Sequence, residues 1–225
     1  MNRISLGGAP NNLMFNKKIN KMKGKIFNAQ EVQAIISKQK TMFREVIKPQ
    51  PNSNINPVKL DYLCRTWQWA TKESRRECPY QVGQKIFCKE SFWEYSRFGD
   101  EFKYDYDADT DYTKCLPDGF PIQRIPLGAW EVKKLPAQHM KQEHSRISLL
   151  IKEIKVERLQ DISAEDCAKE GIAHSRWQAN GQVYGIDMPI TQAFGIFWNA
   201  THKKPEEKFE ASPFVWCVNF EVINN

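Results

Sequence analysis

The last segment of the chain alternates between large apolar residues and their neighbours. Every second residue from 214 to 222 belongs to this set: Phe214, Trp216, Val218, Phe220 and Val222. Because successive side chains of a strand point to opposite faces, this period of two predicts a β-strand with one face in the core. The β-branched residues of 146–158 predict a second long, bent strand. The fold must therefore be built around a sheet.

Three helices are predicted beside these strands. Asn28 is suited to cap a helix whose third residue, Glu31, completes a capping box. Ser163 is suited to cap a second helix, which Gly171 ends. Residues 191–201 carry apolar side chains at helical spacing and predict a third helix on the core. Together these elements predict the α+β class: a small, mostly antiparallel β-barrel with a few flanking helices.

The chain divides into an N-terminal extension and one domain. Residues 1–21 are rich in Asn, Lys and Gly and are expected to be flexible, so function should survive their loss. Residues 22–225 form the domain, with a long loop-rich insertion at about 94–142. Inside the insertion, the acidic segment 100–111 alternates with aromatic residues, which is typical of a hairpin with one polar face.

Composition favours a protein of the cytoplasm. The chain is 41% hydrophobic, enough for a core, yet no apolar run approaches the roughly 20 residues of a membrane span. No two cysteines have C-x-x-C spacing and the histidines are scattered, so we expect reduced, mostly buried thiols. No metal, cofactor or membrane contact is predicted.

The helix that starts at Asn28 runs into a basic turn. Lys38, Lys40, Arg44 and Lys48 follow one another closely, and the chain carries a net charge of +6. One interpretation is a solvated basic loop after a surface helix. The other is an anion-binding edge, because several cations delivered to one place can neutralise phosphates.

The chain resembles the ASCH domain proteins of the PUA-like superfamily, and among them a group found in phages and prophages. Four stretches carry the resemblance: Lys40-Thr41…Arg44-Glu-Val-Ile-Lys-Pro-Gln-Pro51, Cys78-Pro-Tyr…Gly83…Lys89-Glu90-Ser-Phe-Trp93, residues 156–172, and Phe214-Val-Trp-Cys-Val-Asn-Phe220. The resemblance implies a PUA-like β-barrel with a cleft for RNA or for a modified nucleobase. It also implies two alternatives, because some relatives hydrolyse acetylated cytidine and a ribonuclease activity is attributed to others.

In the hydrolases of this family, the basic turn supplies a Lys and a Thr, and the later helix supplies a Glu. Lys40 and Glu170 match the Lys and the Glu, whereas Phe43 stands at the Thr position and Lys38 replaces the usual Gly. Thr41 lies two positions short of the Thr. A metal-independent hydrolase would use Lys40 and Glu170 as an acid–base pair. The alternative is an ion pair that shapes the cleft.

Binding of RNA, or of a nucleobase or nucleoside, is the function that the sequence favours. Tyr80 and Trp93 are candidates for stacking on a base, with core packing as the alternative. His139 would lie on a loop near the site in relatives, although a surface histidine is the commoner case. The polar candidates for nucleic-acid contact are Lys38, Lys40, Thr41, Arg44, Lys48 and Lys89. A further alternative is a phage-encoded protein whose acidic 100–111 surface binds a host protein.

Overall fold

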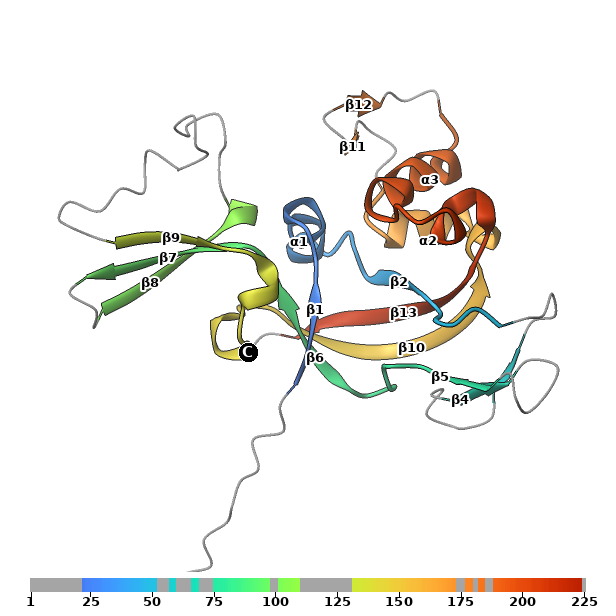
Figure 1. Cartoon of the computed structure of the whole chain (residues 1–225), viewed down its shortest axis with the longest axis horizontal. Helices are drawn as coiled ribbons and strands as arrows, with labels where there is room; N and C mark the ends of the chain where they lie inside the picture. Colours follow the sequence, from blue (N-terminus) through green and yellow to red (C-terminus); the bar gives the residue numbers. More distant parts are fainter. Residues whose placement is uncertain are drawn as a thin grey trace, which may run out of the picture.

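The computed structural model describes residues 22–51, 57–59, 66–68, 75–97, 101–109, 131–172, 177–179, 182–184 and 188–223. Its centre is a five-stranded sheet with the strand order β1-β6-β10-β13-β2 (Figure 1). β1 runs parallel to β6, and the other neighbours are antiparallel. The bounds are β1 Lys23–Ile26, β2 Met42–Val46, β6 Lys85–Lys89, β10 Ser148–Arg158 and β13 Phe214–Ile223.

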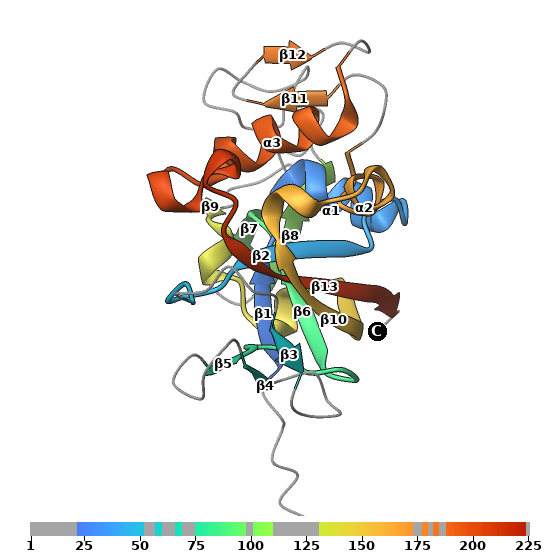
Figure 2. The same ribbon diagram turned by 90° about the vertical axis from the view of Figure 1, so that its right-hand side faces the viewer.

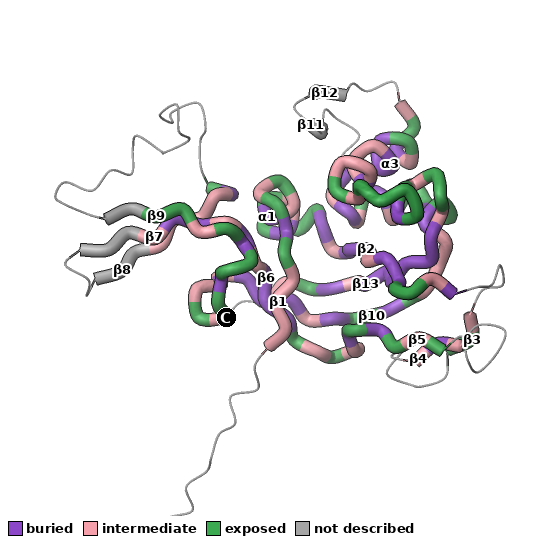
Figure 3. The backbone as a smooth tube through the Cα atoms, viewed as in Figure 1, coloured by how far each residue is buried: buried purple, intermediate pink, exposed green. Residues whose placement is uncertain are grey.

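The two long strands predicted from sequence are confirmed as β10 and β13, which pair along almost their whole length. A register shift between Ile151 and Glu153 gives β10 the irregularity expected of a bent strand. β13 is buried on both faces. Phe214, Trp216, Val218 and Phe220 lie in one apolar core, whereas Val215 and Cys217 lie in a second one. The buried residues follow these strands in Figure 3.

The three predicted helices are also confirmed. α1 (Ala29–Ile36) begins with the Asn28–Glu31 capping box and packs Val32 and Ile35 into the first core. α2 (Ala164–Lys169) is capped by the Ser163 hydroxyl. α2 and α3 (Ile190–Thr201) cover the second core, on the same side of the central sheet (Figure 2). Among the described residues, no helix is long and apolar enough to cross a bilayer.

The described part of the insertion is more regular than predicted. β7 (Phe92–Arg97), β8 (Glu101–Tyr106) and β9 (Glu131–Leu135) form an antiparallel sheet that stands away from the central sheet (Figure 1). The acidic segment 100–111 was predicted to form a hairpin, but it supplies only the second strand, β8, of the β7–β8 hairpin and then the 3₁₀ turn Asp107–Asp109. The other short elements are β3 Val58–Lys59, β4 Thr66–Gln68, β5 Arg75–Glu77, β11 Trp177–Ala179, β12 Gln182–Tyr184, and the 3₁₀ turns η2 Asp107–Asp109, η5 Ala137–His139, η6 Gln142–His144, η7 Leu159–Asp161, η8 Pro205–Glu207 and η9 Phe209–Ala211.

The α+β class is confirmed, whereas the PUA-like barrel stays a prediction. β1 and β2 are the edge strands of the central sheet, with no backbone ladder between them among the described residues. Side chains join these two edges instead. Lys25 Nζ of β1 donates to Glu45 Oε2 of β2 at 2.8 Å, and it also lies over the Phe43 ring. The sheet therefore curls until its edges meet through side chains.

Four cysteines lie in the described part of the chain, and all four are buried free thiols: Cys78, Cys88, Cys167 and Cys217. This confirms the expectation of reduced, buried thiols for these residues. Cys64, Cys115, the extension 1–21 and residues 110–130 of the insertion lie outside the described residues.

Candidate functional site

A turn after α1 delivers Lys40 to the interior. The Lys38 N–H donates to the Ile35 carbonyl, and the Gln39 N–H donates to the Ala34 carbonyl. This pair of bonds is a Schellman motif, and it places Lys38 in the left-handed region at φ 61°. Glycine is the usual residue in this conformation, because a side chain with a Cβ is strained there.

The end of α2 meets this turn. Lys40 and Glu170 form an isolated antiparallel bridge, and the Thr41 N–H donates to the Lys169 carbonyl at 2.8 Å. Gly171 follows with φ 84°, and a Cβ there would lie 3.1 Å from the Ala34 Cβ and 3.3 Å from the Lys40 Cβ. Both the backbone conformation and the close approach therefore require glycine. Main-chain contacts therefore bring Lys40 and Thr41 to the end of α2, beside Glu170.

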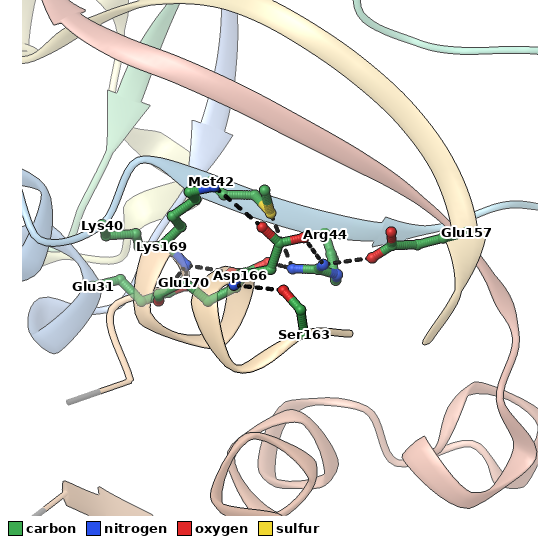
Figure 4. Close-up of polar contacts among 9 residues, drawn as sticks. All are labelled: Glu31, Lys40, Met42, Arg44, Glu157, Ser163, Asp166, Lys169 and Glu170. Carbon is green, nitrogen blue, oxygen red and sulfur yellow. Dashed lines mark hydrogen bonds and ion pairs between the residues drawn. The ribbon is translucent and has the colours of Figure 1, made fainter. Parts of the chain in front are cut away.

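Lys40 is buried among carboxylates (Figure 4). Its Nζ donates to Glu170 Oε2 at 2.7 Å and to the Glu170 carbonyl at 2.9 Å, and it lies 3.4 Å from Glu31 Oε1. Burial by itself would lower the pKa of Lys40, but the charges of Glu170 and Glu31 outweigh it and raise that pKa above its ordinary value. Lys40 is therefore held in its protonated form.

Arg44 occupies the other side of Glu170 (Figure 4). Its Nη1 donates to Glu170 Oε1 at 3.0 Å, and its Nη2 contacts Glu157 Oε1 at 2.5 Å and Asp166 Oδ2 at 3.3 Å. Burial opposes the charge of Arg44, yet Cys217, Glu170 and Glu157 raise its pKa above the ordinary value. Two cations, Lys40 and Arg44, thus face four carboxylates, those of Glu31, Glu157, Asp166 and Glu170.

The expectation that Lys40 and Arg44 neutralise phosphates is corrected by these contacts. Both side chains are buried, and each forms ion pairs with carboxylates of the same chain. A general base must release its proton, and the raised pKa of Lys40 opposes this. The arrangement matches the alternative in which Lys40 and Glu170 form an ion pair that shapes the site.

A pocket of about 280 Å³ lies beside this cluster, between β1, β2 and α3. Arg44 and Glu170 form part of its floor, and further carboxylates come from Glu31 and Glu45. Its remaining wall is mainly aromatic and comes largely from α3. The lining residues are Lys25, Ile26, Phe27, Asn28, Glu31, Phe43, Arg44, Glu45, Glu170, Phe194, Phe197, Trp198, Thr201 and His202. We call this space the carboxylate–aromatic pocket.

The other predicted basic residues do not line this pocket. Lys38 is exposed on the turn, and Thr41 is bound through its backbone. The mostly exposed side chain of Lys48 pairs with Glu207 at 2.6 Å. Lys89 donates to the Gln138 carbonyl at 2.7 Å. These residues are therefore dispersed and do not form one cationic patch with Lys40 and Arg44.

The aromatic candidates and the histidine lie elsewhere too. Tyr80 and Trp93 are buried, as the core-packing alternative predicted. The Tyr80 hydroxyl donates to Glu45 Oε2 at 2.8 Å, so it supports the pocket wall from behind. Phe43 is buried and packs edge-on against Phe27 and Tyr80. His139 is exposed at the end of η5 and does not line the pocket.

Sequence analysis missed the residues that α3 contributes. Phe194, Phe197, Trp198 and His202 were assigned to core packing or not singled out, although Trp198 and His202 are four residues apart and share one helix face. Among the described residues, no three His, Cys, Asp or Glu side chains are grouped to hold a metal ion. A comparison with protein-family models, curated proteins and solved structures finds no match for the chain.

Proposed function

We propose that this protein binds RNA by taking an unpaired base, or a free nucleoside, into the carboxylate–aromatic pocket. The observation that carries the proposal is the meeting of Arg44 and Glu170 at the floor of a pocket with an aromatic wall, where Glu170 is also paired with Lys40. An unpaired base is recognised by stacking on aromatic rings and by hydrogen bonds to its edges. The pocket offers both kinds of contact.

The charges of the site favour a base over a phosphate. Carboxylate oxygens accept hydrogen bonds from the amino and imino groups of bases. The three carboxylates that line the pocket, Glu31, Glu45 and Glu170, outnumber its two cations, Lys25 and Arg44. A phosphate would meet repulsion there. The net charge of +6 supports binding of the nucleic-acid backbone outside the pocket, where Lys38 and Lys48 are exposed.

The resemblance to ASCH domains supports the same proposal. It predicted that Lys40 and Glu170 belong to one site although 130 residues separate them, and their side chains are in contact. We propose that the central sheet is the PUA-like barrel of that family, with β1 and β2 closed by the Lys25–Glu45 ion pair. On this view the pocket lies at the seam between the two edge strands.

The two alternatives receive less support. A hydrolase needs the Lys40–Glu170 contact, but it also needs a lysine that can release its proton and a nucleophile where Phe43 stands. A host-protein interface needs free acidic side chains on 100–111. Two of the described ones are engaged within the chain, since Asp107 pairs with Lys134 at 3.2 Å and Asp109 pairs with Arg146 at 2.5 Å.

Two exposed isoleucines provide a matched test. Ile26 lines the pocket and is 52% exposed, whereas Ile36 is 45% exposed on α1 and does not line it. Ile26→Glu adds a fourth carboxylate at the mouth and should weaken binding of a labelled single-stranded RNA about tenfold, measured by fluorescence anisotropy. Ile36→Glu should leave the affinity nearly unchanged. Equal affinities of the two variants would refute the proposal.

A further inference from the structure

The ring of His202 is held in a fixed position at the end of α3. It stacks on the Trp198 ring with centroids 3.8 Å apart and planes 3° from parallel. Trp198 is itself fixed, because its Nε1 donates to the buried Glu207 carbonyl at 2.8 Å. The His202 backbone N–H donates to the Trp198 carbonyl at 3.0 Å. Because these contacts already order the ring, little further side-chain entropy is lost when a ligand binds to it.

The contacts of His202 define its tautomer. Nδ1 lies 3.0 Å from the Trp198 carbonyl oxygen, which can only accept a hydrogen bond. It also lies 3.0 Å from Thr201 Oγ1, but the Thr201 hydroxyl donates its hydrogen to the same Trp198 carbonyl and can accept from Nδ1. Nδ1 therefore carries the proton, and Nε2 keeps a lone pair. Within the described part of the chain, no residue forms a hydrogen bond with Nε2. His202 lines both the carboxylate–aromatic pocket and a second pocket of about 450 Å³.

We propose that His202 reads the bound base: its Nε2 accepts a hydrogen bond from an N–H group of the base in the carboxylate–aromatic pocket. This inference rests on the proposed function and adds a specificity-determining residue to it. Carboxylates accept such bonds from many directions, whereas the lone pair of a fixed imidazole accepts in one direction in the plane of its ring. His202 thus selects bases that carry a donor at one position.

The role requires a neutral imidazole. Burial lowers the pKa of His202 below its ordinary value, although the Trp198 carbonyl and Glu207 oppose this. Protonation would turn Nε2 into a donor, so base binding should weaken as the pH falls through that pKa. The charged groups that face His202 come from every neighbouring element: Lys25, Glu45, Lys48, Glu77 and Glu207. Glu45 and Glu207 have lowered pKa values and stay ionised over this range.

Two variants separate the hydrogen bond from the stacking. His202→Phe keeps an aromatic ring on Trp198 but removes the acceptor. His202→Gln can present an amide oxygen near the position of Nε2 and does not titrate. The probes are cytidine and uridine, each beside its counterpart methylated on the base nitrogens so that no N–H remains. Binding is followed by NMR of the full chain.

For the preferred nucleoside, the wild-type protein should bind the unmethylated form about three- to tenfold more tightly than the methylated one, the value of one hydrogen bond. His202→Phe should lose this preference, and His202→Gln should retain part of it. Between about pH 7.5 and pH 5, affinity should fall in the wild type and stay flat in His202→Gln.

The outcomes also separate the two proposals. If the nucleosides shift the Phe194 and Trp198 signals, but His202→Phe keeps the preference and the pH profile of the wild type, the role of His202 is overturned and the proposed function stands. If no nucleoside shifts any pocket signal, the proposed function fails and the role of His202 fails with it.

Discussion

Lys40 Nζ donates to both the carboxylate and the backbone carbonyl of Glu170, at 2.7 and 2.9 Å, across 130 residues of sequence. The same carboxylate accepts a hydrogen bond from Arg44 at 3.0 Å through its other oxygen. Glu170 is therefore the centre of the cluster, because its two carboxylate oxygens accept hydrogen bonds from two different cations. The turn after α1, the strand β2 and the end of α2 are joined through this one side chain.

Glu170→Gln should destabilise the fold. The change leaves Lys40 with Glu31 at 3.4 Å and Arg44 with Glu157 and Asp166, so part of the cation charge stays compensated. We expect the free energy of unfolding to fall by about 3 kcal/mol. This is the lower end of the range observed when one partner of a buried ion pair is removed. Denaturant unfolding measures this.

Glu165→Gln is the matched control for that change. Glu165 lies on α2, the helix that Glu170 caps, and its side chain is 78% exposed; within the described ranges its one ion pair is with Lys169. Such surface pairs contribute about 1 kcal/mol or less. If Glu170→Gln cost no more than Glu165→Gln, the cluster around Glu170 would not hold the site together.

Lys38→Gly should stabilise the protein. Lys38 is exposed and has φ 61°, a conformation that costs a residue with a Cβ about 1 kcal/mol but costs glycine little. Glycine also adds freedom to the unfolded chain, so the net gain should be about 0.5 kcal/mol. Thermal unfolding measures it. Gln39→Gly, at an exposed neighbour without a positive φ, should instead be destabilising, and a gain there would contradict the explanation.

The stability contributed by Glu45 should depend on pH. Burial would raise the pKa of Glu45, but Lys25 and the Tyr80 hydroxyl outweigh it and lower that pKa below the ordinary 4.5. A lowered folded-state pKa gives stability that is present above the unfolded value of about 4.5 and is lost as the pH falls through the folded value.

Glu45→Gln should therefore be less stable than the wild type near neutral pH, and the difference should shrink as acid protonates Glu45 in the wild type. Urea unfolding over a pH series measures both. Glu221→Gln serves as the control, because Glu221 is 59% exposed and, in the part of the chain that the structure describes, pairs with Lys152 alone. If the difference in stability between the wild type and Glu45→Gln grew towards acid pH, the result would contradict a lowered pKa of Glu45.

Local patterns predicted the elements that position the site. The Asn28 capping box, the Ser163 cap and the alternation of 214–222 each act within a few residues, so sequence alone reveals them. The cluster itself was only half predictable. Lys40 and Glu170 were paired by the family resemblance, but nothing local shows that Glu157 turns towards Arg44, 113 residues away.

The wrong expectation about the basic turn has a physical cause. A run of Lys and Arg is normally solvated or bound to anions, because burying a charge without a partner is costly. Lys40 and Arg44 are buried only because α2 and β10 bring carboxylates to them. The pocket wall from α3 was missed for a similar reason, since an aromatic stripe at helical spacing is the same whether it packs inward or lines a pocket.

The methyl signals of Ile26 and Ile36 test the central claim most directly. Both side chains are exposed, but only Ile26 lines the carboxylate–aromatic pocket. During titration with a short single-stranded RNA, we expect the Ile26 methyl signals to shift saturably together with the Trp198 indole signal, while those of Ile36 stay in place. A titration in which RNA binds but leaves both Ile26 and Trp198 unshifted would contradict the proposed site.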